Sequence, residues 1–167
     1  MRRIPFVEKE LDTYIEERKQ APCFICEVIE GKPIREKHHI LYEDDKVIVF
    51  FSAFPTHLGQ TLVCPKRHVE QVVGDMLEQE FLYLQKIVYQ VAKAVQEVLE
   101  PERIYIASFG SQQMNKHVHF HILPLPKGVP VKDQQMAAMM PEAGRLELSE
   151  AEWIELAKKI RNRLNHS

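Results

Sequence analysis

The stretch His117-Val118-His119-Phe120-His121-Ile122-Leu123 contains three histidines that alternate with apolar residues. Successive side chains of a β-strand point to opposite faces of a sheet. We therefore expect a strand over residues 117–125 that presents three imidazoles on one face and buries Val118, Phe120 and Ile122 on the other. Three adjacent imidazoles repel one another if protonated and need hydrogen-bonding partners if buried. An exposed polar strand face is thus the weaker reading, and chelation of a metal or handling of a phosphate are the stronger ones.

Working outward, other short apolar segments also read as strands, and they end in turn-forming residues. They are 23–28, 39–42, 46–51, 60–64 and 103–109. Apolar residues recur every three or four positions over 76–99, which predicts one long helix. The same spacing over 6–20, and a capping box at Ser149–Glu152, predict helices toward both ends. The sum is an α+β fold with a mainly antiparallel sheet, a long covering helix and helical extensions at both ends.

The whole-chain numbers describe an ordinary globular protein. The chain has 167 residues, 45% hydrophobic and 28% charged, with a formal net charge of −2. This predicts one compact domain and gives no electrostatic reason to expect nucleic acid or an anionic membrane as partner. No apolar run approaches the roughly 20 residues that span a bilayer. The positively charged N-terminus is not followed by the apolar stretch of a secretory signal peptide. Three cysteines, an odd number, disfavour a closed set of disulfides, so we expect a reduced, cytoplasmic protein.

The histidine stretch resembles the signature of the histidine triad (HIT) family of nucleotidyl hydrolases and transferases. The upstream segments 23–31, 42–47 and 61–69 are similar to the family in content and order. The resemblance covers residues 23–126 and is to the zinc-bearing bacterial and archaeal branch. It implies a HIT-like α+β fold with a mainly antiparallel five-stranded sheet. An N-terminal helical extension (1–22), the HIT domain (23–126) and a C-terminal extension with a terminal helix (127–167) would form one compact unit.

The resemblance also implies a mechanism for the three histidines. His119 would attack the α-phosphorus of a nucleotide derivative and form a covalent nucleotidyl-histidine, which water or another acceptor then resolves. The main-chain carbonyl of His117 would orient the His119 ring, and His121 would contact the phosphate. The expected substrate is a purine nucleotide.

Cys23-Phe24-Ile25-Cys26 forms a CxxC pair. Taken alone, the pair reads as redox-active, as two buried small residues or as half of a tetrahedral zinc site. Cys64 lies in a buried strand, whereas His68 follows that strand, and His38 and His39 compete as ligands. The resemblance implies the set Cys23, Cys26, His68 and His117, holding one structural Zn²⁺ per chain.

Three positions depart from the family pattern. Ser52 stands where members commonly carry an acidic or amide residue that contacts ribose, and Gly59-Gln60 replaces a common Gly-His. Met114 replaces the hydroxyl residue three positions before the first triad histidine. Other polar residues are candidates to bind the substrate or are ordinary loop residues; the set is Ser52, Ser108, Ser111, Gln112, Gln113 and Asn115.

The leading hypothesis is therefore an enzyme that hydrolyses or transfers a nucleoside monophosphate from a phosphoanhydride or phosphoramidate. The departures motivate an alternative, a nucleotide-binding regulatory module with little turnover. A zinc-based interaction module is the third reading. The resemblance further implies a homodimer in which the long helix and a sheet edge pair across a two-fold axis.

Overall fold

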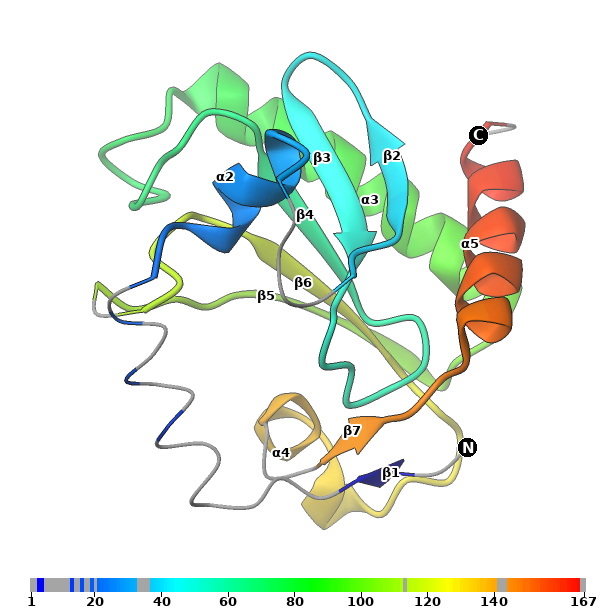
Figure 1. Cartoon of the computed structure of the whole chain (residues 1–167). Helices are drawn as coiled ribbons and strands as arrows, with labels where there is room; N and C mark the ends of the chain where they lie inside the picture. The colour runs from blue at the N-terminus through cyan, green and yellow to red at the C-terminus, as the bar shows by residue number, and fades with distance from the viewer. Residues whose placement is uncertain are drawn as a thin grey trace.

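The computed structural model describes residues 3–4, 13, 16, 19, 21–32, 37–112, 114–140 and 144–165 (Figure 1). Its centre is a five-stranded sheet of strand order β2-β3-β4-β6-β5, in which every neighbouring pair is antiparallel. The strands are β2 (Ile40–Glu43), β3 (Val47–Phe51), β4 (Thr61–Pro65), β5 (Arg103–Ser108) and β6 (Phe120–Leu125). The predicted α+β fold with an antiparallel five-stranded sheet is confirmed.

One face of the sheet is covered by α3 (Glu78–Leu99). Its buried side chains pack with alternate residues of the strands, including Val49, Val63 and Ile122, in the largest core cluster. The last helix, α5 (Glu150–Leu164), packs against α3 and β2 and begins with the predicted capping box. Both predicted helices are confirmed, and α3 starts two residues later than the spacing suggested.

Among the described residues, two short helices lie over the opposite face of the sheet (Figure 1). Near one end lies α2 (Phe24–Ile29), which packs on Ile48, Phe50 and Leu62. At the other end α4 (Met136–Met139) packs through Ala138 on the second half of β6. The triad histidines lie on this same face: the His119 ring contacts Phe24 of α2, and Leu123, two residues beyond His121, packs with Ala138 of α4.

The predicted strand over residues 23–28 is wrong, because this segment forms helix α2. Its β-branched residues suggested a strand. In the structure Ile25, Val28 and Ile29 follow the i, i+3, i+4 spacing of one helical face and pack against the sheet. Tertiary packing therefore overrides the local preference.

The predicted strand over residues 117–125 is correct only from Phe120 onward. Before that residue the chain leaves the sheet ladder, and the Val118 amide donates to the Val69 carbonyl at 2.8 Å. The alternation nevertheless continues through this segment, because Val118, Phe120 and Ile122 all enter the core under α3. The three histidines consequently share the other face.

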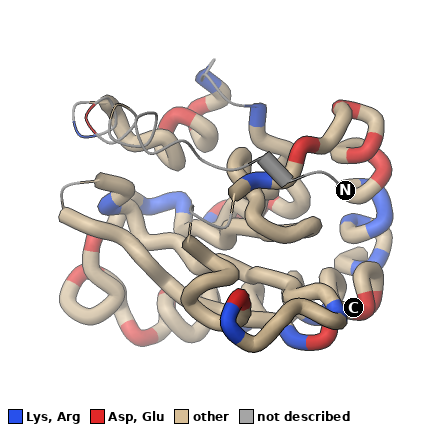
Figure 2. The backbone as a smooth tube through the Cα atoms, turned by 90° about the horizontal axis from the view of Figure 1, so that it is seen from below, with Lys and Arg blue, Asp and Glu red and all other residues tan. Residues whose placement is uncertain are grey.

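Smaller elements complete the described chain. A two-stranded sheet pairs β1 (Arg3–Ile4) with β7 (Arg145–Leu146), and a short 3₁₀ helix, η1, covers Val131–Asp133. Most of the predicted helix over 6–20 lies outside the described residues, of which Thr13, Glu16 and Lys19 are helical. None of the described helices is long and apolar enough to cross a bilayer. Figure 2 shows acidic and basic residues interspersed along the chain, in keeping with the small net charge.

Candidate active site and metal centre

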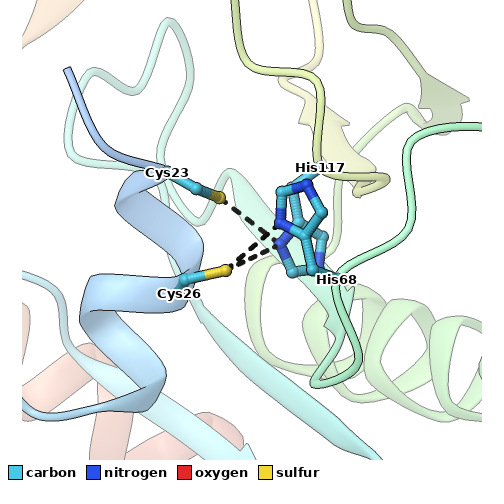
Figure 3. A group of neighbouring side chains, drawn as sticks. All are labelled: Cys23, Cys26, His68 and His117. Atoms are coloured by element: carbon cyan, nitrogen blue, oxygen red, sulfur yellow. Dashed lines mark hydrogen bonds between the residues drawn. The ribbon is translucent and has the colours of Figure 1, made fainter.

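Four metal-ligating side chains meet at one point of the structure (Figure 3). The ligand atoms of Cys23, Cys26, His68 and His117 all lie within 4.8 Å of one another. The Cys26 sulfur lies 3.2 Å from Nδ1 of His68 and 3.6 Å from Nδ1 of His117, and the Cys23 sulfur lies 3.4 Å from Nδ1 of His117. The structure thus brings together the whole set that the sequence proposed as ligands.

The fold explains why these four residues converge. Cys23 is the N-cap of α2 and Cys26 lies three residues along, so both sulfurs project from the same side of the helix. His68 follows the end of β4, and His117 precedes the start of β6. Because β4 and β6 are antiparallel neighbours, the end of one meets the beginning of the other.

Neighbouring acceptors orient both imidazoles of the cluster. Nε2 of His117 donates to the Pro65 carbonyl at 2.9 Å, which leaves the Nδ1 lone pair facing the sulfurs. Nε2 of His68 lies 3.4 Å from a carboxylate oxygen of Glu70, again with Nδ1 facing Cys26. Such outer acceptors fix the tautomer and the orientation of metal-binding histidines.

The donor set has the chemistry of a tetrahedral zinc site, for which two thiolates and two neutral imidazoles are typical. Burial and the neighbouring Cys23 raise the pKa of Cys26 to about 12. Without a cation this thiol therefore keeps its proton, and metal binding would release it. Cys64 is fully buried in the core beside Phe50 and lies outside the cluster.

The competing histidines lie elsewhere. The His38 ring contacts Phe24 and Phe50, with ring centroids 5.9 and 4.9 Å apart. The His39 ring stacks on Trp153 of α5 at 5.5 Å. Neither is part of the four-residue cluster.

His119 is held in a single defined tautomer. Its Nδ1 lies 2.7 Å from the main-chain carbonyl of His117, and since a carbonyl only accepts, Nδ1 carries the proton. Nε2 then keeps the lone pair. Burial lowers the pKa of His119, which is only 4% exposed. The ring is therefore neutral at pH 7 and has the electronic form of a nucleophile.

His121 lies beside this nucleophile, with ring centroids 4.9 Å apart. Its Nδ1 is buried and has no hydrogen-bond partner among the described residues. Burial, followed by the proximity of His119, lowers the pKa of His121 to about 3. A neutral imidazole with an unsatisfied polar atom is suited to a ligand that brings its own hydrogen-bonding groups.

Three contacts around these histidines were not signalled by the sequence. Phe24 of α2 places its ring edge-on to His119, at 6.5 Å between centroids. The Pro65 carbonyl and the Glu70 carboxylate hold the cluster histidines. The Pro65 carbonyl is a main-chain group, which carries no sequence signal. Glu70 carries a weak signal, because its carboxyl group follows His68 by only two residues.

The predicted substrate-binding residues are placed in different surroundings. The Ser108 hydroxyl donates to the main-chain carbonyl of His119 at 2.9 Å, so it braces the triad segment. The Ser52 hydroxyl accepts from the Phe54 amide at 3.3 Å.

The loop before the triad holds the remaining candidates. Ser111 and Gln112 are exposed in a tight turn that the backbone of Ser111 and Met114 closes. Asn115 has a positive φ of 54° and lines a cavity of about 250 Å³ together with His117. Gln113 lies outside the described residues. The roles of all six residues in substrate binding stay predictions.

The Gly59-Gln60 departure has a structural explanation. Gln60 is buried, and its side-chain oxygen accepts from the Thr56 amide at 2.7 Å, which closes the loop between β3 and β4. Gly59 has φ +81°, and a Cβ there would lie 2.4 Å from a methyl of Leu99. These two residues support the loop rather than face the triad.

Several known proteins are similar to this chain in sequence. The family model described as HIT domain matches residues 35–128. An uncharacterised HIT-like protein of Saccharolobus solfataricus is 34% identical over 105 residues, which covers 61% of this chain and 73% of the relative. The adenosine 5'-monophosphoramidase of Schizosaccharomyces pombe is 28% identical over 107 residues, covering 62% and 74% of the two chains.

Solved structures show the same fold. A hypothetical histidine triad nucleotide-binding protein from Sulfolobus tokodaii has a TM-score of 0.68 and 25% identity, covering 86% of this chain and 93% of its own. A zinc-bound histidine triad family protein from Mycobacterium smegmatis has a TM-score of 0.67, covering 86% and 94% of the two chains. At 20% identity the latter likeness concerns the fold alone.

Proposed function

Because the chain belongs to the HIT family, we propose that it is a nucleotide-processing enzyme with a covalent nucleotidyl-His119 intermediate. It hydrolyses or transfers a nucleoside monophosphate from a phosphoanhydride, such as a dinucleoside polyphosphate, or from a phosphoramidate. The observation that carries the proposal is the 2.7 Å hydrogen bond from Nδ1 of His119 to the His117 carbonyl. It leaves Nε2 as the attacking atom, since a nucleophilic imidazole needs one unprotonated nitrogen.

In the first step Nε2 of His119 attacks the α-phosphorus of the substrate. A phosphorus–nitrogen bond forms, and the bond from phosphorus to the leaving oxygen or nitrogen breaks, with its electron pair going to the leaving group. The ring becomes cationic while Nδ1 keeps its proton, and the His117 carbonyl beside that proton stabilises the new charge. Positioning and charge stabilisation of this kind dominate phosphoryl transfer.

In the second step water or another acceptor attacks the same phosphorus. The phosphorus–nitrogen bond breaks, its electron pair returns to Nε2, and the proton of the acceptor is released to solvent. His121, neutral and 4.9 Å from His119 between ring centroids, is the side chain we assign to the phosphate oxygens. Its imidazole N–H donates to them in both steps.

The experiment is a substrate panel of adenine and guanine dinucleoside polyphosphates and nucleoside phosphoramidates, read by mass spectrometry. We expect nucleoside monophosphate as a product, purine substrates to be preferred, and a nucleotidyl adduct on the peptide that contains His119. Added phosphate or sugar phosphate as acceptor separates a transferase from a hydrolase. Turnover that survives His119→Ala removes His119 from the nucleophile role.

The alternative, a nucleotide-binding regulatory module with little turnover, is favoured by one feature. Met114 stands where family members carry a hydroxyl, and it lines the cavity beside His117 without a group that gives a proton to the leaving group. Tight binding of AMP with no turnover across the panel would support this alternative.

We also propose that the cluster of Cys23, Cys26, His68 and His117 holds one structural Zn²⁺ per chain. The proposal rests on the convergence of four suitable ligand atoms within 4.8 Å. When bound, the ion would tie α2 to the start of the triad segment. Elemental analysis of purified protein tests this, with about one zinc expected in the wild type and in Cys64→Ala, and none in Cys26→Ser.

We further propose that the protein is a homodimer. Exposed apolar side chains on α3 and on the edge strand β5, Leu82, Tyr89 and Ile106, support a homodimer through this side of the molecule. Sedimentation at micromolar concentration tests it, and a monomer would contradict it.

The three free thiols favour a reducing, cytoplasmic setting. We retain 1–22, 23–126 and 127–167 as the proposed organisation of the chain.

A further inference from the structure

Two phenylalanine rings flank the neighbouring histidines His119 and His121. Phe24 of α2 lies edge-on to His119, at 6.5 Å between ring centroids. Phe109, the residue after β5, has its ring 5.9 Å from that of His121. We propose that Phe109 is a specificity-determining residue that stacks on a planar ring of the leaving group. The preferred substrates are then dinucleoside polyphosphates, whose leaving group carries a second base. The inference rests on the proposed function and narrows its substrate class.

The two rings lie on opposite sides of the triad segment. Helix α2 packs on residues of β3 and β4, whereas Phe109 directly follows β5. The strand order places β4 and β5 on opposite sides of β6, the strand that contains His121 (Figure 1). A phosphate held by His119 and His121 therefore has an aromatic ring on each side. Its two large substituents are the transferred nucleoside and the leaving group, and each meets a ring if both contain a base.

The difference in enclosure assigns the leaving group to Phe109. The ring of Phe24 stacks on His38 at 5.9 Å and meets Phe50 edge-on at 6.4 Å, so it belongs to an aromatic group. Phe109 is 39% exposed and lies outside the apolar core clusters of the described residues. With a covalent intermediate the nucleoside stays bound through both steps, whereas the leaving group departs and the acceptor enters in its place. The open side suits that exchange.

The backbone fixes Phe109 at both of its neighbours. Ser108, the last residue of β5, donates its hydroxyl hydrogen to the His119 carbonyl at 2.9 Å. Gly110 approaches the loop before the triad so closely that a Cβ there would lie 3.0 Å from the Asn115 carbonyl oxygen. A ring on such a fixed backbone loses little freedom when a ligand stacks on it, so more of the stacking energy appears as affinity.

The test compares two substrates that share the transferred nucleotide and the type of bond that breaks. Attack at the α-phosphorus of diadenosine tetraphosphate releases ATP, whereas the same attack on adenosine 5'-tetraphosphate releases triphosphate, which has no ring. Phe109→Leu keeps an apolar side chain without a ring, and Phe109→Trp keeps a ring. Ile154→Ala is the control, because it removes another exposed apolar side chain on α5, which packs on α3 and β2.

The expected change is in KM and depends on the substrate. Loss of an aromatic ring that stacks on a base typically weakens binding by about 5- to 150-fold. We expect KM for diadenosine tetraphosphate to rise by about that factor in Phe109→Leu. Its kcat should change little, because a stack equally strong in the ground and transition states affects binding alone. KM for adenosine 5'-tetraphosphate should stay within about twofold, and Phe109→Trp and Ile154→Ala should keep the wild-type preference.

A binding measurement that needs no turnover completes the test. In a His119→Asn background, calorimetry should show weaker binding of diadenosine tetraphosphate when Phe109→Leu is added, with binding of AMP unchanged. AMP is the matched ligand, since it contains the transferred nucleotide and no leaving group. Circular dichroism checks that each variant is folded.

The outcomes separate this inference from the proposed function. Equal changes for both substrates in Phe109→Leu, or an unchanged KM for both, overturn the stacking role and leave the enzyme standing. Absence of turnover in the wild type overturns the proposed function, and the calorimetry then decides the role of Phe109 alone. Dissociation constants for diadenosine tetraphosphate that are equal with and without the ring overturn it.

Discussion

The two faces of the sheet differ in what they carry. Under α3, side chains such as Val49, Val63 and Ile122 are fully buried in a continuous apolar core. On the opposite face, between α2 and α4, the sheet and its flanks present imidazoles and thiols. One sheet thus separates the apolar core under α3 from the groups to which we assign the chemistry.

The alternation within one short segment produces this separation. Val118, Phe120 and Ile122 enter the α3 core, while His117, His119 and His121 face the other way. Substitutions on the α3 face should therefore change the free energy of unfolding and leave kcat alone. Substitutions of His119 and His121, which lie outside the metal cluster, should do the reverse.

The largest expected effect is on activity, from His119→Asn. Removing the nucleophile should lower kcat at least about a thousandfold, with the free energy of unfolding little changed. Single-turnover kinetics and a search for the covalent adduct measure this. The control is His39→Gln, a histidine on the other side that stacks on Trp153, which should keep wild-type kcat. Equal losses in both variants would contradict the separation of the faces.

The next effect is on stability, from Leu84→Ala in the α3 core. Leu84 is 1% exposed, and truncating a buried leucine costs about 2–5 kcal/mol. Urea denaturation should show this loss, with kcat at 25 °C within about twofold of wild type. Ile154→Ala, in α5 and 53% exposed, should change the free energy of unfolding by less than about 0.5 kcal/mol. A large fall in kcat for folded Leu84→Ala would show that the α3 core and the histidine face are energetically coupled.

Removal of the metal should lower the stability of the fold. A ligand at a hundredfold excess over its dissociation constant stabilises the native state by about 2.7 kcal/mol. Zinc should thus raise the Tm of the wild type and of Cys64→Ala, measured by calorimetry at fixed protein concentration. It should not raise the Tm of Cys26→Ser, whose cluster lacks one sulfur. An equal response of Cys26→Ser would place the stabilising ion elsewhere.

A smaller effect concerns the pH dependence of stability. Burial opposes the ionisation of Asp44, but the hydroxyls of Tyr83 and Tyr42 and two backbone amides donate to it and together lower its pKa. A lowered carboxyl pKa contributes stability that is fully present above the unfolded-state value and is lost as the pH falls through the folded-state value. The loss should occur below about pH 4 and amount to at most about 1 kcal/mol after solvent screening.

Asp44→Asn tests that contribution, because it removes the charge and keeps the size of the side chain. Its free energy of unfolding, followed by urea denaturation from pH 7 to pH 3, should approach that of the wild type as the pH falls. A constant difference between the two proteins would show that Asp44 ionisation is not the source. The measured kcat at pH 7 should be unaffected.

The smallest effects should come from the loop before the triad. Asn115 lines the cavity beside His117, so Asn115→Ala should raise KM by about two- to tenfold, the loss of one hydrogen bond. Gln112 is exposed, and Gln112→Ala should change KM by less than about twofold. Steady-state kinetics with the same substrate measure KM for both variants. A larger rise in KM for Gln112→Ala than for Asn115→Ala would place the substrate contact in the turn rather than in the cavity.

Periodicity determined much of the fold from the sequence. The three-to-four spacing located α3, and the alternation of His117–Ile122 separated the core side chains from the histidines. Both patterns are local consequences of helix and strand geometry, so a single sequence suffices to read them. The local signal failed at α2, whose β-branched residues suggested a strand, because its helical form is stabilised by packing against β3 and β4.

The candidate site divides in the same way. Sequence determined that His119 belongs to an alternating set and that Cys23 and Cys26 form a CxxC pair. The family resemblance implied His68 and His117 as their partners, but only the tertiary structure shows how the four meet. The antiparallel pairing of β4 and β6 brings His117, 91 positions from Cys26, to the Cys26 sulfur. The tertiary structure also decided that the His117 carbonyl, which no sequence pattern displays, holds the His119 ring. Long-range packing sets such contacts, because a main-chain acceptor is present at every residue and only the fold selects one.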